Sequence, residues 1–165
     1  MAAEAGAYRE INIWLRRRGA AVAHEYLPGE LQEHLGVDSV PDGVMLLKTD
    51  SGYLFLVYEV TFTIALRDVR CIAEWLEGFR EKGWPAIGLV HFRRALPEDD
   101  VTHYITENGR EVIHTVPGMR TLREEATRGG VLLMQHGAFP WRPPGWRPPT
   151  AMPEVPSPLA SASQW

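Results

Sequence analysis

Cysteine is nearly absent from this chain of 165 residues. With Cys71 as its single cysteine, the chain cannot form an internal disulfide or a cysteine-rich zinc site. No hydrophobic run approaches the roughly 18 apolar residues of a membrane-spanning helix. Residues 1–19 contain no apolar segment typical of a secretion signal. We therefore expect a cytoplasmic protein that does not bind a membrane.

An excess of positive charge is also missing. The formal net charge is −4, from 17 basic and 21 acidic residues, whereas a protein that coats nucleic acid is strongly basic. The phosphate-binding motifs GxxxxGK[ST] and GxGxxG do not occur, and neither does the GxSxG motif of serine hydrolases. These absences exclude a histone-like protein and leave nucleotide-dependent chemistry without support.

The composition that remains is that of one soluble domain with a tail. Apolar residues make up 45% of the chain and charged residues 23%, both ordinary for a globular protein. The composition changes after Gly137, because the segment 138–165 holds eight of the 13 prolines. We predict an α/β domain over residues 1–137 and a Pro/Trp-rich C-terminal tail over residues 138–165.

The tail contains a short tandem repeat, in which Trp141-Arg-Pro-Pro is followed after Gly145 by Trp146-Arg-Pro-Pro. Proline fixes φ and lacks an N–H, so this segment favours polyproline II. One interpretation is a docking motif for a protein partner with an aromatic-lined groove. The commoner alternatives are a disordered tail and a tail whose tryptophans lie on the surface of its own domain.

Periodicity predicts alternating helices and strands in residues 1–137. Apolar residues at helical spacing predict helices over roughly 3–18, 65–82 and 119–128. Short apolar runs predict strands at Ala21–Tyr26, Val44–Lys48, Tyr53–Ile64, Ala86–Phe92 and Val131–Met134. A hairpin around Asn108-Gly109 joins Val101–Thr106 to Glu111–Val116. The run 53–64 is apolar on both faces, which places it in the middle of a sheet covered by helices.

Two carboxylates fall at the open end of the first predicted hairpin. With a two-residue Ser51-Gly52 loop, Asp42 pairs opposite Thr61 and Glu59 pairs opposite Val44. All four side chains then share one face of the sheet. We therefore expect the two carboxylates to converge.

A carboxylate on an otherwise apolar face needs a partner, because an unpaired buried charge is costly. A divalent cation is one partner, since magnesium prefers one or two carboxylates together with water and phosphate oxygens. An ion pair with Arg67 or Arg70 and a hydrogen bond from a backbone amide are the others. The carboxylates alone leave these explanations open.

This arrangement resembles the PD-(D/E)XK nuclease-like superfamily, which has the restriction-endonuclease fold. The core of that fold is a helix, a three-strand meander, a helix and a further strand. Its signature is an aspartate on one hairpin strand, then Asp/Glu-x-Lys on the next, and Pro41-Asp42 and Glu59-Val60-Thr61 take these positions. The resemblance covers roughly residues 3–92. It implies a restriction-endonuclease-like α/β core with an added C-terminal β-hairpin, helix and strand.

The function that the resemblance implies is a DNA nuclease that depends on Mg²⁺ or Mn²⁺. Asp42 and Glu59 would be metal ligands, joined by the backbone carbonyl of Val60 and by Glu10 from the first helix. Thr61 stands where the family has a catalytic lysine, which orients water and stabilises charge on the phosphate. Because threonine is uncharged, Arg67 is the nearest residue in sequence that could replace it.

Two alternatives stand beside the active nuclease. Some members of the superfamily have lost catalysis and only bind DNA or a protein, and the change at Thr61 fits such a member. The other alternative is an unrelated α/β domain in which Asp42 and Glu59 coincide by chance. The resemblance also implies a homodimer, because many nucleases of this fold act as dimers.

Several further residues invite a functional interpretation. The run Arg16-Arg17-Arg18 would contact a DNA backbone, or would be the solvated last turn of a helix, where cations are favoured. His103 and His114 are expected to form a solvent-facing cross-strand pair rather than a metal site, because no third ligand is evident. Cys71 lies on the apolar side of its helix and is expected to be an inert, buried thiol.

Overall fold

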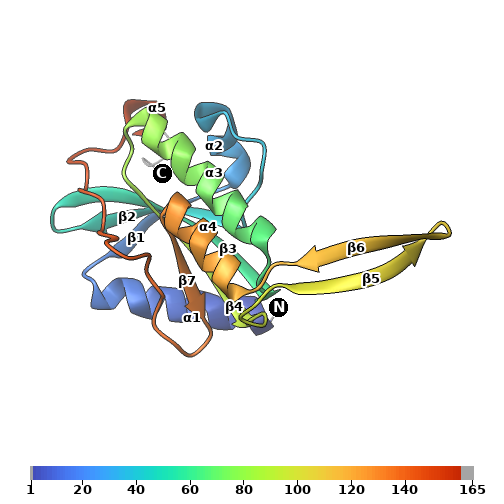
Figure 1. The fold of residues 1–165 in the computed structure, drawn as a ribbon. Coiled ribbons are helices and arrows are strands. Elements are labelled where there is room, and N and C mark those ends of the chain that lie inside the picture. Colours follow the sequence, from blue (N-terminus) through green and yellow to red (C-terminus); the bar gives the residue numbers. More distant parts are fainter. Residues whose placement is uncertain (1, 161–165) are drawn as a thin grey trace.

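A computed structural model describes residues 2–160 and has the α/β architecture that the sequence predicts (Figure 1). In chain order, the elements are α1 (Ala2–Arg17), β1 (Ala21–Tyr26), α2 (Pro28–Leu35), β2 (Gly43–Thr49), β3 (Gly52–Thr63), α3 (Leu66–Lys82), β4 (Ala86–Arg94), β5 (Val101–Glu107), β6 (Arg110–Val116), α4 (Met119–Gly129), β7 (Val131–Gln135) and α5 (Ser157–Ala160). Every predicted helix and strand is present, and helices α2 and α5 are additional.

Five strands form one mixed sheet, in the order β1-β2-β3-β4-β7. Strands β1, β2 and β3 are an antiparallel meander, whereas β4 runs parallel to β3 and β7 runs parallel to β4. Helix α3 connects β3 to β4, and α4 precedes β7. The carboxyl ends of three parallel strands therefore meet at one edge of the sheet.

Helices cover both faces of this sheet, with α1 on one side and α3 and α4 on the other (Figure 1). Even-numbered β3 residues such as Leu56 pack in the cluster that holds Ile11 of α1. Odd-numbered ones such as Phe55 pack against Phe79 of α3 in the other cluster. The alternation of a strand thus decides which helix each side chain meets.

Helix α3 shows why the sequence folds locally as predicted. Val69, Ile72 and Phe79 are fully buried, whereas Arg70, Glu74 and Glu77 are exposed, which gives the helix one apolar face. The Asp68 side chain caps the start of the helix, because its Oδ2 accepts a hydrogen bond from the Ala65 amide at 2.9 Å. At the other end, Gly83 has a φ of +72° and closes the helix in the left-handed conformation.

Helix α2 is absent from the sequence prediction, which places only a turn at Pro28-Gly29. Proline lies in the first turn of this helix, where its missing N–H costs no hydrogen bond. Leu31 and Leu35 are buried, and Gly36 ends the helix with a φ of +66°. Here proline and glycine begin a helix instead of only ending a strand.

The β2–β3 hairpin turns one residue earlier than predicted. Thr49 pairs with Gly52, so the loop is Asp50-Ser51 and not Ser51-Gly52. The Thr49 hydroxyl donates to the Gly52 carbonyl at 3.0 Å and accepts the Ser51 amide at 3.2 Å. This side chain therefore stabilises the earlier turn, a role typical of threonine next to a loop.

Strands β5 and β6 form a separate hairpin that projects away from the rest of the molecule (Figure 1). Its turn is Asn108-Gly109, and His103 pairs directly with His114, as predicted. Every residue of β5 is exposed, and so is every residue of β6 except Val112. The two histidines thus face solvent on the projecting hairpin.

The C-terminal segment packs back on the domain. Trp141 pairs with Leu133 of β7, and Met152 pairs with Tyr53 of β3. Leu159 is only 4% exposed and belongs to the hydrophobic cluster between the sheet and α3. The described part of the tail is therefore an integral layer of the structure, with both Trp141 and Trp146 against the core.

Candidate functional site

Two clusters of ionisable side chains lie near the carboxyl ends of the parallel strands, on opposite faces of the sheet. The carboxyl cluster consists of Asp42, Glu59 and Asp68 on the face covered by α3. The histidine cluster consists of Glu10, His91 and His136 on the face covered by α1. Ligand sites in open α/β sheets favour this edge, because loops and strand ends diverge there.

The carboxyl cluster is built by the open end of the β2–β3 hairpin. Val44 pairs with Val57, so Asp42 lies opposite Glu59 when the register is continued by two residues. The predicted pairing of Asp42 with Thr61 and of Glu59 with Val44 is therefore wrong by two residues. A slip of two keeps every side chain on its face. The prediction that the two carboxylates converge is therefore correct, although the predicted strand register is not.

The surroundings of Glu59 keep its carboxyl group protonated. Burial raises the pKa of Glu59 to about 9, helped by a hydrogen bond with Asp42 and by the negative charges of Asp42 and Asp68. The Glu59 side chain is half-buried, while Asp42 is exposed. At neutral pH the Glu59 carboxyl group therefore carries a proton, and its neighbours are acidic.

Within the described residues, Glu59 forms no ion pair with Arg67 or Arg70, the two arginines considered as its partners. Arg70 is engaged elsewhere, with its Nε 3.3 Å from Oε1 of Glu125. Arg67 lies near Asp68, where it lowers the pKa of that carboxyl, although burial still raises the pKa overall. The thiol of Cys71 contacts Glu59, and burial raises the pKa of Cys71 to about 11, which agrees with an inert thiol.

The motif residues after Glu59 take different directions. The Val60 amide donates to Oδ2 of the exposed Asp42 at 2.6 Å, so the backbone-amide partner considered for Glu59 belongs to Asp42 instead. The N–H and C=O of one residue in a strand point to the same side, so the Val60 carbonyl faces the edge where Asp42 lies. Thr61 shares the face of Glu59, and its hydroxyl donates to the Thr63 carbonyl at 3.2 Å.

Glu10 does not join Asp42 and Glu59. It projects from α1, which covers the opposite face of the sheet, and its carboxylate meets His91 and His136 instead. The expectation that the first helix supplies a third ligand to the Asp42–Glu59 pair is therefore wrong. The physical reason is that β3 is apolar on both faces, so its sequence does not reveal which face α1 covers.

The histidine cluster was not predicted from the sequence. Oε1 of Glu10 lies 2.7 Å from Nε2 of His91 and 3.2 Å from Nδ1 of His136. Oε2 accepts the Gly137 amide at 2.8 Å. A weak signal was available in the sequence, because His91 interrupts a buried apolar run and His136 lies two residues after the end of another. Three distant elements must meet before these residues form a group.

The arginines expected to bind DNA are spread over the molecule. Arg16 and Arg17 end α1, and Arg18 lies 5.5 Å from the ring of Trp14. These residues precede β1, whose first residue, Ala21, pairs with Lys48 near the closed end of the hairpin. A strand of this length spans roughly 20 Å. The arginine run is therefore at the end of the sheet opposite Asp42 and Glu59.

Comparisons with protein-family models, with curated protein sequences and with solved structures find no match to this chain. None of the helices among residues 2–160 combines the length and the apolar character that crossing a membrane requires. The function must therefore be inferred from the geometry of the two clusters.

Proposed function

We propose that this protein is a nuclease-like α/β domain that binds a divalent cation between Asp42 and Glu59 and hydrolyses DNA phosphodiesters. The observation that carries the proposal is the meeting of these two carboxyl groups at the open end of the β2–β3 hairpin. The order of elements adds support, because α1, the β1–β2–β3 meander, α3 and β4 follow the order of a restriction-endonuclease-like core.

The carboxyl cluster fits a hard cation. Its donors are carboxylate oxygens, and the exposed Asp42 leaves the site open to water and to a phosphate. Burial and the negative charges of Asp42 and Asp68 keep a proton on Glu59, and a bound cation would replace that proton. When bound, Mg²⁺ or Mn²⁺ would supply an activated water and neutralise charge on the phosphate.

The protein's own residues would position this chemistry. The Val60 amide orients the Asp42 carboxylate, and the Val60 carbonyl faces the same edge. In the reaction, a water oxygen attacks phosphorus, one P–O ester bond breaks, and the leaving oxygen takes up a proton. Arg67, whose charge acts on Asp68 of this cluster, is the cation that could stand in for the lysine replaced by Thr61.

A second candidate is a nuclease-like module that binds DNA or a protein partner without cleaving it. Two observations favour it: Thr61 makes its hydrogen bond to the backbone of its own strand, and Glu10 lies on the other face of the sheet. Under this alternative the carboxyl pair would be a remnant of the site. The exposed β5–β6 hairpin and the tail surface then become the regions to test for contacts.

The decisive experiment is DNA cleavage with Mg²⁺ or Mn²⁺, using supercoiled, linear and branched DNA. Wild type, Glu59→Gln and His103→Ala are purified identically, the last as a control on the projecting hairpin. Cleavage by wild type and His103→Ala, but not by Glu59→Gln, supports the nuclease. DNA binding without cleavage by any of the three proteins supports the inactive module.

A further inference from the structure

The histidine cluster has the donor set of a transition-metal site. Glu10 from α1, His91 from β4 and His136 after β7 bring one ligand atom each to within 4.8 Å of one another. Ligands around a tetrahedral zinc ion with bonds of about 2.0–2.1 Å lie about 3.3 Å apart. The Glu10–His136 distance of 3.2 Å matches that separation, whereas the Glu10–His91 distance of 2.7 Å is that of a hydrogen bond and would lengthen around a metal ion.

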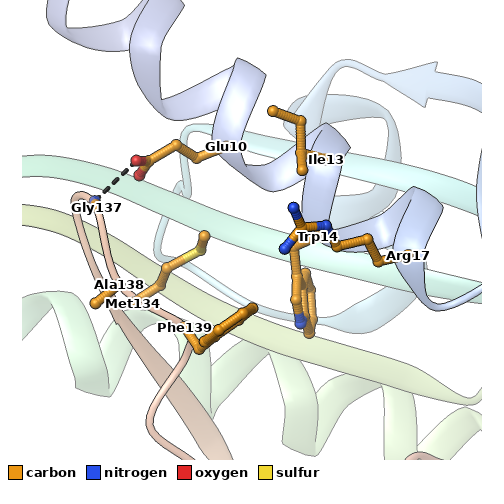
Figure 2. Close-up of a pocket in the computed structure, with 8 residues that line it drawn as sticks. All are labelled: Glu10, Ile13, Trp14, Arg17, Met134, Gly137, Ala138 and Phe139. Carbon is orange, nitrogen blue, oxygen red and sulfur yellow. Dashed lines mark hydrogen bonds between the residues drawn. The ribbon is translucent and has the colours of Figure 1, made fainter.

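The carboxylate of Glu10 is held ready for such a role. The Gly137 amide donates to Oε2 of Glu10 (Figure 2). Oε1 of Glu10 lies within contact distance of both histidines. Burial opposes ionisation of Glu10, but hydrogen bonds from His91 and Gly137 and the charge of His136 lower its pKa. An ionised carboxylate accepts hydrogen bonds only, so Nε2 of His91 carries the proton that a metal ion would replace.

Two buried polar atoms beside the cluster lack hydrogen-bond partners in the described structure. They are Nδ1 of His91, whose side chain is only 1% exposed, and Nε of Arg93. Arg93 lies on the same face of β4 as His91, and its Nη2 approaches the same part of α1 as the His136 ring does, at Gly6. Buried groups without partners are uncommon and indicate a missing ion, ligand or water.

Glu10, alone of the three cluster residues, lines a pocket of about 260 Å³ next to α1 (Figure 2). Glu10 lies at its edge, and the walls include Trp14, Phe139 and the cationic side chain of Arg17. The side chain of His136 is 38% exposed, so an ion can reach the cluster from solvent. The pocket leaves room for water or an anion beside the three protein ligands.

We propose that Glu10, His91 and His136 bind a divalent transition metal, of the class of Zn²⁺, Co²⁺ or Fe²⁺. Two imidazoles and one carboxylate suit these borderline ions, whereas Mg²⁺ prefers oxygen ligands only. Three protein ligands leave at least one position open, which is the arrangement of a reactive rather than a purely structural metal site. Arg17 and Arg93 favour an anionic ligand at the open position.

The test is a titration of the whole chain with Co²⁺ and Zn²⁺. The visible absorption of Co²⁺ reports its coordination, and calorimetry gives the Zn²⁺ stoichiometry and affinity. We expect one ion per chain in the wild type. His136→Ala, a change at a partly exposed residue, is expected to weaken binding by at least 100-fold, because losing even a residue that only hydrogen-bonds to a metal ligand costs roughly 10–100-fold.

Two matched variants keep the result specific. Glu59→Gln alters the carboxyl cluster on the other face, and His103→Ala removes a histidine from the projecting hairpin, so both should retain the Co²⁺ spectrum and the Zn²⁺ affinity. The proposal is overturned if wild type binds neither ion, or if His136→Ala binds as tightly as wild type. Because neither readout involves DNA, failure here is separate from failure of the proposed nuclease function.

Discussion

The two faces of the central sheet place a glutamate in opposite situations. Glu59 faces other carboxyl groups, and its pKa rises to about 9. Glu10 faces two imidazoles and a backbone amide, and its pKa falls below the ordinary value. Burial disfavours the charged form of both residues, so the difference comes from their neighbours. Clusters on one sheet can thus select different cations.

The largest expected effect is an exchange of metal preference between the faces. Glu10→Gln is expected to weaken Zn²⁺ binding by about 100-fold or more, because it removes a metal ligand. Losing a residue that only hydrogen-bonds to a ligand already costs roughly 10–100-fold in affinity. The same variant should leave Mg²⁺ binding unchanged. Glu59→Gln should weaken Mg²⁺ binding and leave Zn²⁺ binding unchanged. Calorimetric titrations of both variants with both ions check this, and one variant losing both ions would break the distinction between the clusters.

The next effect is a pH dependence confined to the carboxyl cluster. Glu59 must release a proton to bind a cation, since its pKa is about 9. The apparent Mg²⁺ affinity is therefore expected to rise about tenfold for each pH unit between pH 6 and 8. Titrations at fixed ionic strength would measure this slope. A flat profile would show that Glu59 is not a ligand.

A smaller effect, opposite in sign on the two faces, is expected in stability. Glu10 has a lowered pKa, so its contribution is present above the unfolded pKa near 4.5 and is lost as the pH falls through the folded value. At pH 7, Glu10→Gln should cost about 1.5–3 kcal/mol, the range for hydrogen bonds to charged groups. Glu59 has a raised pKa, so wild-type stability falls as the pH rises from about 4.5 to about 9.

The measurement for both glutamates is urea unfolding between pH 4 and pH 9. The advantage of Glu59→Gln over wild type should grow with pH, since glutamine mimics the protonated acid. The disadvantage of Glu10→Gln should shrink as the pH is lowered. Parallel profiles for the two variants would contradict the assigned environments.

The smallest effect concerns the second histidine pair. His103 and His114 lie opposite each other, but both strands of their hairpin are exposed and Glu107 is the acidic group near His114. His103→Ala is expected to change the free energy of unfolding by less than about 0.5 kcal/mol, as is usual at surface positions. Urea unfolding with and without Zn²⁺ checks this. A larger loss, or a loss of Zn²⁺ stabilisation, would move the metal site to the hairpin.

The fold was largely predictable because its signals are local. Helix α3 follows from the spacing of Val69, Ile72 and Phe79, and the projecting hairpin follows from Asn108-Gly109. Asp42 and Glu59 were placed on one face despite an incorrect turn, because a slip of two residues preserves the alternation. These conclusions need only neighbours in the sequence.

The histidine cluster was not predictable in the same way. Its three residues come from α1, β4 and the segment after β7, and only the tertiary fold brings them together. The position of Glu10 was wrong for the same reason, since the apolar faces of β3 give no sign of which one α1 covers. Helix α2 was missed because Pro28-Gly29 is typical of turns and also permits a helix start.

The return of the C-terminal segment has a consequence for how the molecule opens. Tyr53 and Met152 exchange two backbone hydrogen bonds, and so do Leu133 and Trp141, although each pair joins separate parts of the chain. Release of the segment would free the Tyr53 and Leu133 amides without unfolding the sheet, as a cooperative sub-global unit does. Hydrogen exchange at these amides therefore reports the local free energy that holds the tryptophan-rich segment in place.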